Sequence, residues 1–168
     1  MCNHQQPPPA SFCLRCGTRL VSRREDDRER QVCPACGWVY YPKSNMASAV
    51  AILQDRQVLM VRRKYDPFRG QWTLPSGFME YGEGPTETAI REMREELGVD
   101  VELTGLVDVL MERGDPRGPC LLVVYTGRIA GGQLRAGDDA AEVRAFPLDR
   151  LPEKIAFKAH REALEKLA

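Results

Sequence analysis

The sequence predicts an α/β protein in two parts, with a small cysteine-bearing module ahead of a larger domain of strands and helices. Four of the six cysteines fall within residues 12–41. From residue 46 onward, strand-like apolar stretches are mixed with two stretches of helical spacing. A polar start that contains Pro7-Pro8-Pro9 is typical of a flexible segment. We therefore expect a flexible tail over residues 1–11, a module over 12–41 and a mixed domain over 46–168.

The strands of the larger domain are expected where apolar residues cluster or alternate between turn signals. Residues 46–53 form an apolar run suited to a buried strand, and residues 57–61 predict a strand that returns after a turn at 54–56. The polar segment 62–70 and the glycine-rich segment 77–84 are expected to be loops. Further extended segments are expected at residues 72–74, 101–111, 119–128 and 142–146.

Two helices are expected in the same domain. Pro85 suits the first turn of a helix, because its φ is already fixed near the helical value and its missing N–H has no partner there anyway. This helix should run to Leu97 and end at Gly98, since glycine readily takes the left-handed conformation that closes a helix. A last helix is expected over about residues 157–167.

Composition and charge exclude several classes of protein. Hydrophobic residues make up 43% of the chain and the formal net charge is zero, which favours a globular domain over a disordered or nucleic-acid-wrapping one. The longest apolar stretch, residues 47–53, is far short of the roughly 20 residues that a bilayer needs. The N-terminus lacks the basic start and apolar run of a signal peptide. We therefore expect a cytoplasmic protein without membrane or nucleic-acid partners.

The cysteines of the first module have the spacing of metal ligands. Cys13-x2-Cys16 and Cys33-x2-Cys36 form two pairs, and a glycine follows each pair. Glycine can take the positive φ that a tight turn around a metal ion needs. Four thiolates complete a closed tetrahedral shell, which is typical of structural Zn²⁺. The alternatives are a redox pair or incidental cysteines, but the expected compartment disfavours disulfides.

The second candidate site is the acidic face of the first helix. Glu92, Glu95 and Glu96 fall at i, i+3 and i+4 and so share one narrow arc. A divalent cation would remove their mutual repulsion, and hard oxygen ligands at this density select magnesium or manganese over zinc. Taken alone, the same pattern fits a solvated helix whose glutamates pair with Arg91 and Arg94. The residues just upstream favour the metal site.

These residues form a motif that resembles the Nudix box. The match is Gly77-x5-Glu83-x7-Arg91-Glu92-Met93-x-Glu95-Glu96-x-Gly98-Val99, and residues 70–77 resemble the usual lead-in. Together with the four cysteines, the motif is similar to the zinc-ribbon group of Nudix hydrolases, which includes NADH and FAD pyrophosphatases. The resemblance extends from about residue 12 to the C-terminus. It implies a Nudix α/β/α sandwich with a mixed sheet, preceded by a zinc ribbon.

The resemblance also implies a chemistry, namely hydrolysis of a diphosphate linkage by water attack on phosphorus. By motif position, the ligands of Mg²⁺ or Mn²⁺ would be three carboxylates and one backbone carbonyl, those of Glu92, Glu95, Glu96 and Gly77. Glu83 would pair with Arg91 and orient the loop. The metal ions would offset the charge of the diphosphate and lower the pKa of a bound water.

Three further assignments have alternatives. The general base would be a box glutamate or Glu142, which follows the last long strand, where many relatives place an extra glutamate; Glu142 fits a surface charge equally well. Arg62 and Arg63 end a strand where relatives often bind phosphate, although an exposed strand end explains them too. Phe157 either packs in the core or belongs to an adenine pocket like that of related pyrophosphatases.

The substrate class follows from the resemblance alone. The tryptophan- and proline-rich signature that NADH pyrophosphatases carry after the box is absent from residues 111–119. We expect a small nucleotide such as FAD, NADH or ADP-ribose, with FAD-like dinucleotides preferred. One alternative is removal of a nucleotide cap from RNA, which would also need a basic channel. Another is a non-catalytic nucleotide-sensing Nudix domain. Relatives also predict a homodimer.

Overall fold

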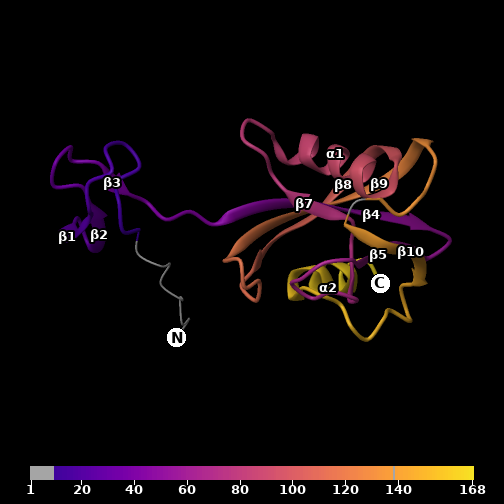
Figure 1. The fold of residues 1–168 in the computed structure, drawn as a ribbon. Helices are drawn as coiled ribbons and strands as arrows, with labels where there is room; N and C mark the ends of the chain where they lie inside the picture. The colour runs from indigo at the N-terminus through magenta and orange to yellow at the C-terminus, as the bar shows by residue number, and fades with distance from the viewer. Residues whose placement is uncertain (1–9, 138) are drawn as a thin grey trace. The chain divides into compact units, whose positions relative to one another are not determined.

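The structure is a computed structural model that describes residues 10–137 and 139–168. The expected tail over residues 1–11 lies outside the described residues except for its last two positions. The chain divides into two compact units, with the boundary between Lys43 and Ser44 (Figure 1). In the described part of the chain, no helix has the length and apolar character needed to cross a bilayer.

The first unit is a small antiparallel sheet held around two tight turns. Its strands β1 (Val21–Glu25), β2 (Arg28–Val32) and β3 (Val39–Tyr40) lie in that order. In the two turns, Gly17 N–H donates to Cys13 O at 2.9 Å and Gly37 N–H donates to Cys33 O at 3.0 Å. The two glycines have φ of 71° and 72°, which residues with a Cβ rarely adopt. The turns are therefore near copies of each other.

The second unit is built on a seven-stranded mixed sheet. The order along its main path is β10 (Ala140–Pro147), β5 (Gln57–Arg63), β4 (Asn45–Gln54), β9 (Cys120–Gly132) and β8 (Val99–Glu112). Two short strands lie off this path: β6 (Trp72–Thr73) pairs with β5, and β7 (Ser76–Phe78) pairs with β4. The pairing of β4 with β9 is parallel and the others are antiparallel.

Two helices cover opposite faces of this sheet, α1 (Pro85–Leu97) on one side and α2 (Lys158–Glu165) on the other (Figure 1). The alternation of side chains along β4 explains the two layers, since neighbouring residues of a strand face opposite sides. Ala49 packs in the cluster that includes Leu164 of α2. Val50 packs in the cluster that includes Met93 of α1. The expected α/β/α sandwich is confirmed.

The first helix begins and ends where the sequence predicts. Pro85 is its first residue, and Gly98 closes it in the left-handed conformation with φ of 68°. The expected loops were partly wrong. Arg62 and Arg63 extend β5 because they pair with β10, and residues 76–78 form β7 because they pair with β4. Such short pairings depend on a neighbouring strand, so periodicity along the chain does not reveal them.

Leu164 tests the layer formed by α2. Its side chain is completely buried between α2 and the sheet, so we expect Leu164→Ala to lower the free energy of unfolding by about 2–5 kcal/mol. The matched control is Leu106→Ala on β8, where the residue is 60% exposed and the change should stay within about 0.5 kcal/mol. Urea unfolding followed by circular dichroism measures both. Equal losses would contradict the packing of α2.

Candidate functional site

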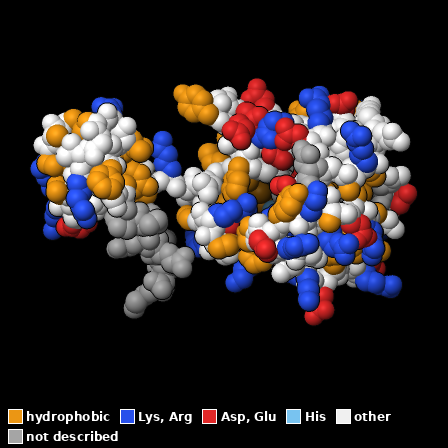
Figure 2. Space-filling view, viewed as in Figure 1, with side chains coloured by type: hydrophobic (Ala, Val, Ile, Leu, Met, Phe, Trp, Pro, Cys, Tyr) orange, Lys and Arg blue, Asp and Glu red, His pale blue; other side chains and the backbone are white. Residues whose placement is uncertain are grey.

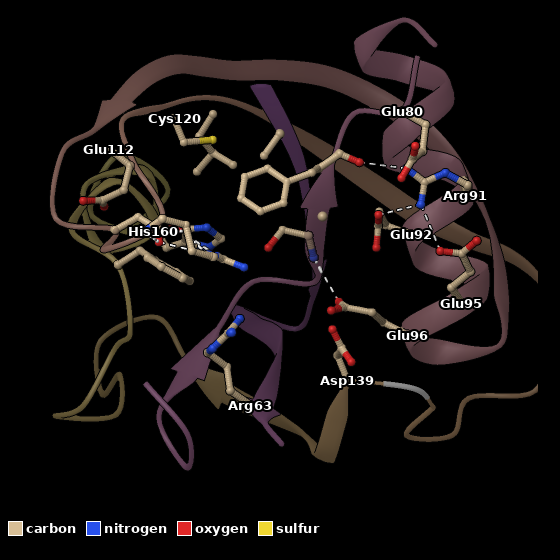
Figure 3. A pocket seen from close by; sticks show the side chains of 18 residues that line it. Arg63, Glu80, Arg91, Glu92, Glu95, Glu96, Glu112, Cys120, Asp139 and His160 are labelled. Atoms are coloured by element: carbon tan, nitrogen blue, oxygen red, sulfur yellow. Dashed lines mark hydrogen bonds and ion pairs between the residues drawn. The ribbon is translucent and has the colours of Figure 1, made fainter. Parts of the chain in front are cut away.

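A cavity of about 370 Å³ opens beside the first helix of the second unit. On one side α1 presents the carboxylates of Glu92, Glu95 and Glu96, and on the other side lie Glu112, Cys120 and His160 (Figure 3). The space-filling view shows acidic side chains gathered around a basic one, near α1 and the segment that leads into it (Figure 2). The cavity therefore has an acidic end and a second end of mixed chemistry.

Arg91 organises the acidic end by using all five of its guanidinium N–H groups. Nε and Nη2 donate to the two carboxylate oxygens of Glu83 at 2.7 and 2.9 Å, and Nη2 also donates to Phe78 O at 2.9 Å. Nη1 donates to Glu92 Oε1 at 2.6 Å and to Glu95 Oε2 at 2.9 Å. Arg91 lowers the pKa of Glu83 to about 2. The loop before α1 is thus tied to the helix by a charged fork.

Glu96 is the buried carboxylate of this end, with 8% of its surface exposed. Its Oε2 accepts a hydrogen bond from Ser76 N–H at 3.0 Å, and it forms no ion pair with any described residue. Burial raises the pKa of Glu96 to about 8, although the bond from Ser76 opposes the shift. A buried carboxylate without a cation is costly to ionise, so a proton or a metal ion would stabilise it.

Gly77 permits the close approach of Glu92 to β7. A Cβ at position 77 would lie 1.9 Å from Glu92 Oε1 and 2.1 Å from Glu92 Cδ, far inside van der Waals contact. A larger residue at position 77 would therefore displace the Glu92 carboxylate from its place beside β7. Burial also raises the pKa of Glu92, which is opposed by its contact with Arg91.

The donor chemistry of this end fits a hard divalent cation. Glu92, Glu95 and Glu96 all line the cavity, and carboxylate oxygens are the ligands that Mg²⁺ and Mn²⁺ prefer. The carboxylates of Glu92 and Glu95 are bridged by Arg91 Nη1. Among the described residues, only the four cysteines of the first unit bring three or more candidate ligand atoms within 4.8 Å of one another.

The two arginines at the end of β5 have different positions. Arg63 lines the cavity, whereas Arg62 does not. Strand geometry explains the difference, because adjacent residues face opposite sides of a sheet. Arg62 forms an ion pair with Glu142 at 3.0 Å across β5 and β10, and Glu142 also contacts Arg144. Glu142, like Arg62, is not among the residues that line the cavity.

Asp139 is a carboxylate of the cavity that sequence reasoning missed. It immediately precedes β10, lines the cavity, and lies close enough to Glu96 for its charge to help raise the pKa of Glu96. Figure 3 shows the two carboxylates facing each other. The available signal was weak, since Asp139 lies in a turn and its approach to α1 depends on where β10 pairs with β5.

At the second end of the cavity, Arg63 lies beside an aromatic pair. Its Nε donates to Pro67 O at 2.7 Å, and its guanidinium lies 5.3 Å from the centre of the Phe157 ring. Phe68 packs edge-on against Phe157 with 5.2 Å between ring centres. Burial lowers the pKa of Arg63, which forms no ion pair with a described residue. Phe157 is buried and lines the cavity, so it both packs and borders the site.

His160 adds a neutral imidazole to this end. Its Nδ1 lies 2.9 Å from Thr73 Oγ1 and accepts a bond from Leu74 N–H at 3.3 Å. This acceptor role assigns the ring proton to Nε2. Burial lowers the pKa of His160 to about 3, and the charge of Arg63 acts in the same direction.

The end of β8 and the turn that follows it supply three charged residues that the sequence did not single out. Glu112 accepts hydrogen bonds from Gly114 N–H at 2.5 Å and from Ala159 N–H at 3.0 Å, which links the end of β8 to the start of α2. Asp115 and Arg117 pair with each other at 2.7 Å. All three of these charged residues line the cavity.

The four cysteines of the first unit fit a zinc ion. The Sγ separations are 3.7 Å for Cys13–Cys36 and Cys16–Cys36 and 3.5 Å for Cys16–Cys33. A tetrahedron with Zn–S bonds of about 2.3 Å has edges of about 3.8 Å. Cys13 and Cys33 are buried, while Cys16 and Cys36 are exposed.

Comparisons with known families assign both units. The model described as NUDIX domain matches residues 44–167, and the model described as Nudix N-terminal matches residues 11–42. The chain belongs to the Nudix family. The acidic end of the cavity is thus the Nudix box of this chain, and the cysteine-bearing unit is the N-terminal zinc-ribbon module found in the same family.

Individual Nudix relatives agree with this assignment. The chain is 41% identical over 107 residues to the ADP-ribose pyrophosphatase of Methanocaldococcus jannaschii, covering 63% of each protein. It is 31% identical over 144 residues to the NAD-capped RNA hydrolase NudC of Pseudomonas aeruginosa, covering 84% of this chain and 49% of that protein. The chain thus spans less than two thirds of either relative. A solved NUDIX hydrolase from Nitrosomonas europaea superposes with a TM-score of 0.81 at 30% identity, covering 93% and 89% of the two chains.

His160 gives this Nudix domain a pH dependence that can be tested. The folded pKa of about 3 lies below the usual 6.5. Between these two pH values His160 binds a proton in the unfolded chain and stays neutral in the folded chain. The stability from neutral His160 is complete above pH 6.5 and is lost as the pH falls toward about 3. We expect His160→Gln to reduce the slope of unfolding free energy between about pH 7 and pH 5.

Urea unfolding of the parent and His160→Gln proteins in metal-free buffer measures this slope. Glu96 titrates in both proteins, so its contribution cancels in the difference between them. The other histidine, His4, lies outside the described residues and is also common to both proteins. Parallel pH profiles would show that His160 does not titrate as its burial requires.

Proposed function

We propose that the chain hydrolyses the diphosphate linkage of a nucleoside diphosphate derivative, using Mg²⁺ or Mn²⁺ held by Glu92, Glu95 and Glu96. One observation carries the proposal: the three box carboxylates open into the same cavity as Arg63, a half-buried cation without an ion-pair partner in the described chain. A diphosphate complements both ends, because it binds cations at the carboxylates and a guanidinium at Arg63.

Some residues of the box would bind the metal ions, and others would position the residues that bind them. Bound Mg²⁺ or Mn²⁺ would neutralise phosphate charge and lower the pKa of a water molecule. Glu96, which is buried without a cation, gains most from a metal partner, and the carbonyl of Gly77 would add a further oxygen ligand. Arg91 holds Glu92 and Glu95 in place, and Glu83 in turn fixes Arg91.

For the general base, we favour Asp139 or a box glutamate over Glu142. A base must lie within hydrogen-bond reach of the attacking water. Asp139 borders the cavity opposite Glu96, whereas Glu142 is paired with Arg62 and Arg144 outside the lining. We assign phosphate binding to Arg63, because its Nε is fixed by Pro67 O and its remaining donors are unpaired.

For the substrate, we favour ADP-ribose and NAD-type compounds. The similar proteins carry the names ADP-ribose pyrophosphatase and NAD-capped RNA hydrolase, which moves these compounds ahead of the FAD-like dinucleotides expected from the sequence. Removal of an NAD cap from RNA is the second candidate, because the similarity to NudC spans 84% of this chain. The homodimer expected from relatives stays a prediction, and light scattering on the full chain tests it.

A substrate panel tests the proposed hydrolysis directly. ADP-ribose, NAD, NADH, FAD and NAD-capped RNA are incubated with Mg²⁺ or Mn²⁺, and products are followed by phosphorus NMR. We expect cleavage of a diphosphate linkage that chelator abolishes and that Glu95→Gln and Glu96→Gln reduce by about 100-fold or more, since loss of groups that only support metal ligands already costs about 10- to 100-fold. Full activity in chelator, or in both folded variants, would overturn the proposal.

Variants of Asp139 and Glu142 distinguish between these two candidates for the general base. We expect Asp139→Asn to lower kcat by on the order of 100-fold, because a positioned base contributes about that much or more. The matched variant Glu142→Gln should change kcat less than about threefold, since Glu142 borders only the outer ion pairs. Steady-state kinetics on ADP-ribose measures both. The reverse order of losses would return the role to Glu142.

The zinc ribbon gives a separate prediction. We propose that the chain binds about one Zn²⁺, and that Cys33→Ser abolishes this binding because a structural site needs all four ligands. Cys120→Ser is the matched control, since Cys120 is also buried but lies in the second unit. Metal analysis of the purified proteins reads out the result. Equal zinc content in parent and Cys33→Ser would refute the four-cysteine site.

A further inference from the structure

Two of the three arginines that line the cavity, Arg63 and Arg117, have surroundings that differ in a way that the proposed diphosphate chemistry does not explain. Arg63 has no carboxylate partner among the described residues. Arg117, by contrast, is paired with Asp115, whose side chain is only 3% exposed. An unpaired guanidinium is suited to bind phosphate. A guanidinium whose charge is already balanced has little left to offer an anion.

The contacts of Arg117 hold its guanidinium in one plane. Nε donates to Asp115 Oδ1 at 3.0 Å, and Nη2 donates to Asp115 Oδ2 at 2.7 Å. The backbone N–H of Arg117 donates to the same carboxylate at 2.9 Å. The guanidinium carbon lies 4.6 Å from the centre of the Phe78 ring. We call Asp115, Arg117 and Phe78 the Arg117 clamp.

Hydrogen bonds fix both ends of the β8–β9 turn, which contains Asp115 and Arg117. Gly118 N–H donates to Asp115 O at 3.0 Å, and Gly114 N–H donates to Glu112 Oε1 at 2.5 Å. Phe78 is fixed as well, because its carbonyl accepts a hydrogen bond from Arg91 at 2.9 Å. The Arg117 side chain nevertheless remains 42% exposed and borders the cavity. A rigid, planar and charge-balanced surface therefore faces the space beside the box carboxylates.

We propose that the Arg117 clamp is a stacking platform for the nucleobase, or an equivalent planar ring, of the substrate. Phe78 covers one side of the guanidinium, and the ligand ring covers the cavity side. Guanidinium planes stack on aromatic rings and on bases, and this contact does not need the donors that Asp115 occupies. The inference rests on the proposed function, because it places the ring of the same molecule whose diphosphate lies at the box.

Binding of AMP and ribose 5-phosphate, measured by calorimetry, tests the platform, since the two probes share a phosphate and differ by the base. We expect the parent to prefer AMP. We expect Arg117→Ala and Arg117→Lys to lose about 10-fold in AMP affinity, the order of one base-stacking contact, with ribose 5-phosphate unchanged. Lysine retains the positive charge but lacks the planar guanidinium. Because it still pairs with Asp115, this variant carries the test if the alanine protein does not fold. Arg113→Ala, an exposed arginine of the same turn outside the cavity lining, should match the parent.

Kinetics on ADP-ribose add a second readout. The platform predicts a KM about 10-fold higher in both Arg117 variants with kcat within about twofold. Parental AMP affinity in Arg117→Lys, equal losses on both probes, or a parent that does not distinguish the probes would each overturn the platform. A parent that prefers AMP through Arg117 but cleaves no nucleotide would support the platform and contradict the proposed hydrolysis.

Discussion

Arg91 donates five hydrogen bonds, four of them to carboxylates, and the acidic end of the cavity depends on this one side chain. Three acidic residues on one helix arc repel each other unless a positive charge lies among them. Arg91 supplies that charge to Glu92 and Glu95, and its bond to Phe78 O also fixes β7 against α1. Gly77 then lets Glu92 lie against the same strand. Helix, loop and strand are therefore held together by the hydrogen bonds of one arginine.

The two-sided packing of the sheet explains how residues from distant segments reach one cavity. β4 places Ala49 toward α2 and Val50 toward α1, so each helix has its own apolar layer. The cavity lies where the start of α2, the end of β5 and the β8–β9 turn approach the box. Because adjacent residues of a strand face opposite sides of the sheet, Arg63 lines this cavity and Arg62 forms an ion pair outside it. The sheet thus determines which charged residues are available for chemistry.

Much of the architecture was predictable from the sequence because its signals are local. Pro85 and Gly98 marked the ends of α1, and the spacing of the cysteines indicated a four-ligand cluster that the structure brings together. Asp139 and Arg117 were not predictable, because each lies in a turn whose place depends on a distant pairing, that of β10 with β5 for Asp139 and that of β9 with β4 for Arg117. Sequence reasoning likewise could not separate Arg62 from Arg63, since both fitted the same strand end.

The turn between β8 and β9 has a practical consequence for redesign. Both strands continue their pairing well beyond this turn, so the sheet does not rely on the side chains of residues 113–119. Two of these positions, Asp115 and Arg117, border the space next to the box. A combinatorial library confined to this hairpin tip would sample new ligand preferences while sparing the residues that hold the scaffold together, and grafting tips from other members of the family is the simplest such library.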